Sequence, residues 1–237
     1  MLILSSAKLP LSYQEELLKK FIGAEIFLFD MRVKSAVYDS ILSHPDIYFF
    51  EIQPKVFVHA PNVPLDIIKI MENRGAVFLK GKSIPLGLYP ATCAYNGIRI
   101  GKKILHNLKI TDSVIISESK KLGLELRHVP QGYTRCSVVK VNDNALITAD
   151  KGIAEAAIQA GIDVLTIVPG FVTLYGEKYG FLGGASGNTR EGDVIFLGDI
   201  KAHPDFENIA EFFTKHGVNW INLNSGILYD AGTLIVL

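Results

Sequence analysis

Cysteine is scarce in this sequence, and long basic or apolar segments are missing. Two cysteines, Cys93 and Cys136, among 237 residues are too few for a disulfide framework and favour a reducing compartment. The first residues, MLILSSAKLP, lack the basic region that begins a signal peptide. No apolar run reaches the roughly 20 residues that a membrane span requires. The sequence therefore predicts a cytoplasmic protein without a membrane partner.

Net charge is also absent, because 24 Lys and Arg residues balance 24 Asp and Glu residues. Without an overall positive field the chain has no long-range attraction for nucleic acid, which argues against a nucleic-acid partner. Metal-binding spacings such as HExxH and CxxC do not occur, so we expect no metal and no cofactor. Hydrophobic residues make up 49% of the chain, which is typical of a folded protein and not of a disordered one.

Glycines mark a pattern that recurs along the whole chain. Five of them follow a helical pattern and precede an apolar strand: Gly23, Gly75, Gly123, Gly161 and Gly217. Glycine adopts the left-handed conformation that ends a helix without a Cβ clash. The spacings between successive glycines are 52, 48, 38 and 56 residues. Spacings of this size are typical of repeated supersecondary units.

A further apolar strand is predicted before each later helix, in KVFVHAP, SVIISES, NALITAD and DVIFLGD. The first unit has only MLILSSA, so we expect the C-terminal GTLIVL to pair beside MLILSS and complete it. The predicted fold is thus α/β, with five units of strand, strand, helix and strand closed on themselves in a single domain over residues 1–237. The alternative is a five-stranded doubly wound sheet. The segments before the helices are long enough for an extra strand, and no Gly-rich nucleotide loop is present, which favours the repeat.

Five such units around a pseudo-fivefold axis resemble the pentein fold, the five-bladed α/β propeller of the guanidine-modifying enzymes. The stretch HPDIYFFE is similar to the P-D-x-x-F-x-E-D pattern of the hydrolases, with Glu51 at its Glu and Ile52 at its substrate-binding Asp. The closing stretch WINLNSGILYDAGTLIVL is similar to the family's C-terminal pattern but has no Cys, and YGFLGGASGNT has no His. The resemblance implies a central ligand channel without the family's usual Cys/His pair.

The two thiols, Cys93 and Cys136, are the candidate nucleophiles if chemistry persists. Each opens a unit's first strand, so we expect both near the axis at one end of the channel, unbonded to each other. A nucleophilic thiol needs a nearby cation or base that lowers its pKa. The alternative is that both are buried structural thiols, the commonest state of free cysteine.

Polar turns at equivalent places in the units supply candidate substrate-binding residues, which are Glu51, Arg135, Asn188, Asp193, Asn224 and Ser225. A carboxylate such as Glu51 or Asp193 can hold a guanidinium through a charge-assisted bidentate contact. We expect Glu51, Asn188 and Ser225 to converge with at least one Cys around one cavity. For each residue alone, a local hydrogen bond to the backbone is the alternative.

Two functions from different classes remain open. The first is a site for a small guanidino-type or related metabolite in the central channel. If the protein is also an enzyme, it is expected to be a hydrolase or an amidinotransferase that acts on C–N bonds of a guanidino compound. The second is a non-enzymatic protein that binds a macromolecule, similar in role to the ribosome anti-association factor of the same superfamily.

Overall fold

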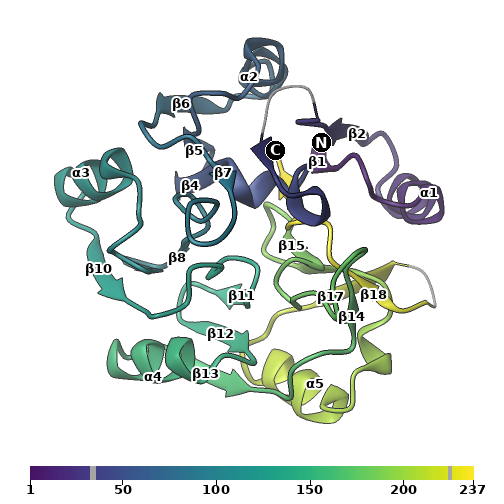
Figure 1. Ribbon diagram of the computed structural model, residues 1–237. Coiled ribbons are helices and arrows are strands. Elements are labelled where there is room, and N and C mark those ends of the chain that lie inside the picture. The colour runs from purple at the N-terminus through teal and green to yellow at the C-terminus, as the bar shows by residue number, and fades with distance from the viewer. Residues whose placement is uncertain (33–35, 224–225) are drawn as a thin grey trace.

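A computed structural model describes residues 1–32, 36–223 and 226–237 of the chain. The described part contains five α-helices: α1 (Leu11–Lys20), α2 (Leu65–Glu72), α3 (Ser113–Lys121), α4 (Lys151–Gln159) and α5 (Phe206–Lys215). Figure 1 shows these helices at the periphery and small sheets towards the middle. No helix in the described ranges has the length and apolar character needed to cross a membrane.

Four of the helices each connect the second and third strands of a three-stranded sheet, and the four sheets have the same strand order. In the sheet around α2, β4 (Phe49–Gln53) pairs antiparallel with β5 (Val56–His59), and β5 pairs parallel with β6 (Val77–Lys80). The next three sheets repeat this order with β8 (Ile98–Ile100), β9 (Lys103–His106) and β10 (Glu125–His128); β11 (Val138–Asn142), β12 (Ala145–Thr148) and β13 (Asp163–Thr166); and β15 (Ser186–Asn188), β16 (Val194–Leu197) and β17 (Trp220–Leu223). The predicted order of two strands, a helix and a strand is therefore present in these sheets.

The remaining three-stranded sheet joins the two ends of the chain. β1 (Leu2–Ser6) pairs parallel with β2 (Glu25–Phe29) and antiparallel with β19 (Ile235–Val236). In Figure 1 the purple N-terminal and yellow C-terminal segments accordingly lie side by side. The expected pairing of GTLIVL with MLILSS is confirmed. No sheet of the described ranges has more than three strands, so the doubly wound alternative is wrong.

Local signals set both ends of the helices, and the sequence predicts the C-terminal ends from the glycines. The Asp150 side chain accepts a hydrogen bond from the backbone N–H of Ile153 at 2.9 Å and caps α4. Ile153 and Ala157 face the core from this helix. All five glycines that follow a predicted helix have a positive φ, between 62° and 83°. Each helix therefore ends two or three residues before its glycine.

One predicted strand is wrong, because SVIISES (113–119) lies within α3. The Asp112 side chain accepts a hydrogen bond from the backbone N–H of Val114 at 2.8 Å and starts a helix there. The strand before α3 is β9 instead. A short apolar run fits a buried helix as well as a strand, so the capping residue decided the outcome.

Neighbouring units share their hydrophobic cores. Ile98 and Ile100 of β8 lie in one cluster with Val138 of β11 and Ile153 of α4. Each unit therefore buries apolar surface against the next one, which a single unit of this size cannot do alone.

Two short strand pairs tie together the loops that precede the first strands of the units. β3 (Ala36–Val37) pairs with β7 (Leu86–Gly87), and β14 (Val172–Thr173) pairs with β18 (Leu228–Tyr229). The Ser40 hydroxyl also donates to the Glu177 carboxylate at 2.7 Å. These loops therefore cover one end of the molecule, and the turns after the first strands form the other end.

The buried imidazole of His106 should make the protein less stable in acid. Burial lowers the pKa of His106 from 6.5 to about 4. Below pH 6.5 the unfolded chain therefore binds a proton that the folded chain does not bind until about pH 4. The free energy of unfolding should fall across this interval, by about 2 kcal/mol at pH 5. Urea unfolding at pH 7 and pH 5 should show a smaller pH effect in His106→Gln than in the wild type. An equal pH effect in both proteins would contradict this assignment.

Candidate functional site

A cavity of about 850 Å³ lies where the first strands of the five sheets come together. Every one of those strands contributes to its wall, for example through Phe49 of β4, Ile98 of β8, Val141 of β11, Asn188 of β15 and Ile235 of β19. The turns after these strands form its rim. Tertiary structure alone assembles such a site, because its residues come from all parts of the sequence.

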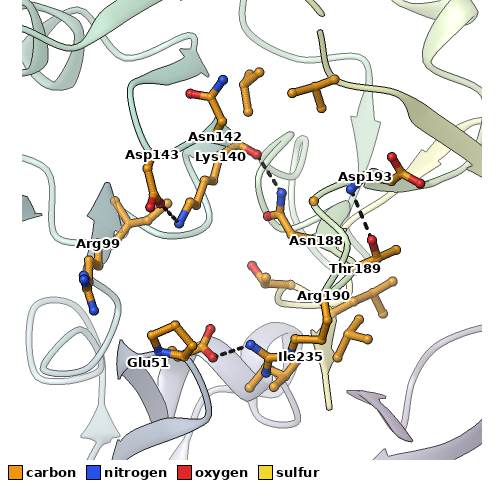
Figure 2. Close-up of a pocket in the computed structure, with 18 of the residues that line it drawn as sticks. Glu51, Arg99, Lys140, Asn142, Asp143, Asn188, Thr189, Arg190, Asp193 and Ile235 are labelled. Carbon is orange, nitrogen blue, oxygen red and sulfur yellow. Dashed lines mark hydrogen bonds and ion pairs between the residues drawn. The ribbon is translucent and has the colours of Figure 1, made fainter. Parts of the chain in front are cut away.

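Four of the predicted binding residues line this one cavity: Glu51, Arg135, Asn188 and Asp193. Figure 2 shows three of them, Glu51, Asn188 and Asp193, around a common open centre. Asn224 and Ser225 lie outside the described residues. The expected convergence of Glu51 and Asn188 is therefore observed, and their roles in binding stay predictions.

Glu51, the carboxylate expected to bind a ligand, already forms an ion pair with the guanidinium of Arg190. Its Oε1 lies 2.8 Å from Nη1 of Arg190 (Figure 2). The same oxygen accepts a hydrogen bond from the backbone N–H of Lys55 at 2.9 Å. The Glu51 side chain is 39% exposed, so water competes for this ion pair. A ligand cation must displace Arg190 before it can bind Glu51.

Asn188 and Asp193 differ in how much of their hydrogen-bonding capacity is used. The Asn188 side chain donates to the backbone carbonyl of Lys140 at 2.9 Å and so links two units (Figure 2). Within the described residues, the Asp193 carboxylate accepts a single long hydrogen bond, from Asn219 at 3.3 Å. Among the ion pairs of the described ranges, none includes Asp193. Asp193 is thus a carboxylate free to bind a cation.

Asp46 is the site residue that the sequence analysis missed, although it lies in the quoted stretch HPDIYFFE. It belongs to the short 3-10 helix η2 (Pro45–Ile47), lines the cavity and is 2% exposed. Its Oδ2 accepts hydrogen bonds from the Cys136 thiol at 3.0 Å and the Thr233 hydroxyl at 2.9 Å. Its Oδ1 has no hydrogen-bond partner in the described part of the chain. Burial raises the pKa of Asp46, and the bonds from Cys136 and Thr233 oppose that rise.

Asp46 belongs to a group of five residues, one from each unit, that we call the axial cluster: Asp46, Asn96, Cys136, Gly183 and Thr233. Each stands two or three residues before its unit's first strand. The Asn96 amide donates to the Cys136 sulfur at 3.1 Å, and the Thr233 hydroxyl lies 3.2 Å from the Gly183 carbonyl oxygen. The axial cluster therefore closes the cavity at the end nearer the starts of the first strands.

The two thiols are unbonded to each other, as predicted, and both are buried, but neither lines the cavity. The expectation that each opens a first strand is wrong, because β8 begins five residues after Cys93 and β11 two residues after Cys136. Burial raises the pKa of Cys136 well above its usual value, and the carboxylates of Asp46 and Asp230 raise it further. Burial also raises the pKa of Cys93 to about 12. Arg135 is the residue before Cys136 in the chain, but its charge does not offset the rise in the pKa of this thiol. These surroundings favour the alternative of structural thiols, and a nucleophilic role stays a prediction.

Iodoacetamide should distinguish a reactive thiolate from a buried thiol. We expect both cysteines of the native protein to resist labelling at pH 6, because only the thiolate reacts quickly and burial disfavours it. Both should react once the chain is unfolded in guanidinium at a higher pH. Mass spectrometry of tryptic peptides measures each site separately. Fast native labelling of Cys136 at pH 6 would instead identify it as an activated nucleophile.

Two more titratable groups lie against the axial cluster. Burial raises the pKa of Asp230 to about 7 and lowers that of His44 to about 3. The Asp230 carboxylate accepts hydrogen bonds from the backbone N–H groups of Phe181 and Gly232, at 2.8 and 3.0 Å. In the described ranges, no group of three or more His, Cys, Asp or Glu side chains could hold a metal ion. The cluster is therefore a poorly solvated region whose groups favour their neutral forms.

Sequence comparison relates nearly the whole chain to one family. Residues 11–235 match the family described as a family of unknown function, DUF6873. A comparison with curated proteins finds no match.

Solved structures with the same fold are guanidine-modifying enzymes of the pentein superfamily. SxtG, an amidinotransferase from Microseira wollei in the saxitoxin biosynthetic pathway, has a TM-score of 0.54 at 10% identity, over 94% of this chain and 88% of its own. A DDAH mutant from Pseudomonas aeruginosa, complexed with citrulline, has a TM-score of 0.54 at 12% identity, over 94% and 92%. A substrate-bound agmatine deiminase mutant from C. jejuni has a TM-score of 0.52 at 12% identity, over 94% and 87%. At these identities the similarity establishes the fold alone.

Proposed function

Because the chain belongs to the DUF6873 family, whose function is unknown, we propose from its fold and its cavity that it binds a small guanidino-type or related metabolite. In this proposal the five units are the blades of a closed propeller that forms one domain over residues 1–237, and the ligand lies at their centre. The proposal rests on Asp46, a buried carboxylate in the cavity wall, one oxygen of which has no hydrogen-bond partner in the described part of the chain.

Asp46 supplies the chemistry that a guanidinium or amidinium group requires. Its Oδ2 is held by Cys136 and Thr233, and Oδ1 is left to accept an N–H from a ligand. An unpaired buried carboxylate oxygen is costly, and a cationic donor would remove that cost. Since burial disfavours the charged form of Asp46, binding of a cation is expected to release a proton and to strengthen as the pH rises.

The cavity also suits a small metabolite in size and in charge. Its volume of about 850 Å³ lies within the range of small-molecule sites. Asp193 offers a second carboxylate on the wall, and Glu51 offers a third once Arg190 is displaced. The fold neighbours are an amidinotransferase, DDAH and agmatine deiminase, which supports a guanidino ligand by analogy.

Catalysis is a conditional part of the proposal. An active protein would be a hydrolase or amidinotransferase acting on a guanidino C–N bond, with Cys136 as its nucleophile and Asp46 as the base 3.0 Å from the sulfur. The raised pKa of Cys136 and its separation from the cavity surface argue for binding without turnover.

Macromolecule binding is the second candidate function, and a different surface supports it. The loops before the first strands expose large apolar side chains, namely Ile84, Leu86, Leu88, Tyr89, Phe171, Tyr175, Tyr179 and Ile227. The ring of Tyr133 packs between those of Tyr89 and Phe181, with centroids 5.7 and 6.5 Å away, so two of these loops are neighbours. An apolar surface of this kind suits a protein partner and not a nucleic acid.

A thermal-shift screen tests the first candidate. Arginine, agmatine and citrulline would be compared with lysine and putrescine, which have amines in place of the guanidino or ureido group. A guanidino compound should raise the melting temperature in a saturable way, because a ligand that binds only the folded state stabilises it. The proposal fails if none of the three compounds changes the melting temperature, and macromolecule binding then becomes the better explanation.

Arg190→Gln should tighten the binding of a guanidino ligand by about threefold, because the ligand no longer has to displace Arg190 from Glu51. Glu51→Gln should weaken binding by a similar factor. Lys121→Gln is the matched control, since it also removes a cation from an exposed ion pair, with Glu118 at 2.6 Å, but neither residue lines the cavity. Isothermal titration of the three variants measures these changes. Weaker binding in Arg190→Gln would show that Arg190 itself contacts the ligand.

A further inference from the structure

A second cavity, of about 280 Å³, lies at the start of α4 and is separate from the central one. The loops before β11 and β15 and the segments that follow β12 and β13 form its wall. Figure 1 shows α4, β12 and β13 next to one another. Among the described residues, none lines both cavities. A ligand of the second cavity would therefore not compete with a ligand of the central one.

The inner part of the second cavity is apolar. Ile167 and Leu182 line it and are 6% and 9% exposed. Val168 and Tyr179 also line it but are each 43% exposed, which places them at its mouth. The cavity is slightly smaller than the range of about 300–1,000 Å³ that is usual for drug-sized ligands. It therefore suits a small molecule with an apolar group that fills the interior.

The Asp150 carboxylate adds a charge to this apolar cavity. Asp150 lines the cavity and is partly exposed, between the buried interior and the exposed mouth. One carboxylate oxygen, Oδ1, accepts the hydrogen bond from the backbone N–H of Ile153 that caps α4. The other, Oδ2, accepts a longer hydrogen bond from the side-chain amide of Gln131, at 3.2 Å. Both donors are neutral, so neither balances the negative charge.

Asp150 also has no counter-ion. Over the ranges that the structure describes, no Lys, Arg or His nitrogen lies within 4.0 Å of its carboxylate. Lys151, the next residue in the chain, is exposed and does not pair with it. The partial positive charge at the start of a helix stabilises a carboxylate there without occupying the cavity. The second cavity thus combines an apolar interior with one carboxylate that has no cation beside it.

We propose that this second cavity binds a small primary amine that carries an apolar or aromatic substituent. The substituent lies against Ile167 and Leu182, and the ammonium group pairs with the Asp150 carboxylate. A charge-assisted hydrogen bond of this kind is stronger than one between neutral groups. The aromatic side chains of Tyr179 and Phe181 line the same cavity, and aromatic faces also attract ammonium groups. The site is independent of the proposed function, because it lies in another cavity and requires no guanidino group.

Benzylamine tests the site, and two related compounds separate its charge from its ring. Benzyl alcohol has the ring without the charge, and methylamine has the charge without the ring. Each compound is titrated into isotope-labelled protein, and the backbone amide signals are followed by NMR. Benzylamine should shift the signals of Gly170, Gly180 and Leu182, which line the cavity, in a saturable way. The other two compounds should bind at least about tenfold more weakly, since each lacks one of the two interactions.

Asp150→Asn removes the charge and keeps the cap of α4, because Asn is as good an N-cap as Asp. This variant should bind benzylamine about tenfold more weakly and benzyl alcohol as the wild type does. Glu155→Gln is the matched control, since it removes a negative charge from an exposed position of the same helix that does not line the cavity. Ala149→Leu places a larger side chain in the cavity wall and should abolish the binding of both compounds.

The proposal is overturned if benzylamine leaves the signals of the cavity residues unchanged, or if Asp150→Asn binds it as tightly as the wild type. Equal affinities of the wild type for benzylamine and benzyl alcohol would also overturn it, because the carboxylate would then contribute nothing. This comparison decides the question even if Asp150→Asn folds poorly. Asp46→Asn should leave the binding of benzylamine unchanged, so a failure of this proposal is distinguishable from a failure of the proposed function.

Discussion

Deleting residues 232–237 should leave a chain that does not fold into soluble protein. The deletion removes Leu234, Val236 and Leu237, which are 3%, 3% and 7% exposed. Burial of each such side chain contributes about 1.5–3 kcal/mol. Their sum approaches the total stability of about 5–15 kcal/mol that a domain usually has. The deletion also exposes the edge of β1, which invites aggregation.

Soluble yield and cooperative melting measure this effect. Two single substitutions in β19 form a matched pair for it. Val236→Asp places an unpaired charge in the core and should reproduce the deletion. Ile235 is partly exposed at the cavity, so Ile235→Thr should fold normally. A shortened chain that melts like the wild type would mean that β19 does not complete the first unit energetically.

Asp46→Asn should weaken the binding of a guanidino ligand by about 3 kcal/mol, roughly 100-fold, if the proposed function is right. The amide keeps the shape of the side chain but removes the charge that a buried cation requires. Because burial already favours the neutral form of Asp46, the amide should change the melting temperature little. Isothermal titration of the ligand found in the screen measures the loss.

Asp193→Asn is the control for that experiment, because Asp193 lies on the same cavity wall near its rim and is partly exposed. Its effect should be several-fold smaller, since water screens the charge there. Equal affinities in the wild type and Asp46→Asn would place the ligand's cationic group elsewhere. The observation that carries the proposed function would then be lost.

Local signals account for the parts of the fold that could be predicted. A helix end depends on residues within one turn, so Gly161 was informative without any knowledge of distant contacts. The pairing of β19 with β1 also followed from the sequence, because the first repeat lacked a strand and the C-terminal segment contained one that belonged to no other repeat. SVIISES was ambiguous because apolar residues in a short run suit both a strand and a buried helix.

The site depended on information of another kind. Glu51 and Asn188 were found because the sequence predicted polar turns at equivalent places of the repeat. The prediction of turns is wrong, since Glu51 lies in β4 and Asn188 in β15, but the equivalent places are the first strands that line the cavity. Asp46 was passed over, since its partners Cys136 and Thr233 are 90 and 187 residues away. Nothing in the neighbourhood of Arg190 along the chain indicates that it pairs with Glu51, 139 residues away.

The sequence by itself determined the repeated unit, the helix ends and the strand that joins the two termini, because hydrophobic period, capping and glycine conformation are local properties. Only the tertiary structure decided which charges meet at the centre. A charge's partner and its loss of water depend on all the segments packed around it, so Asp46 became a buried acceptor only when five distant strands closed around one cavity.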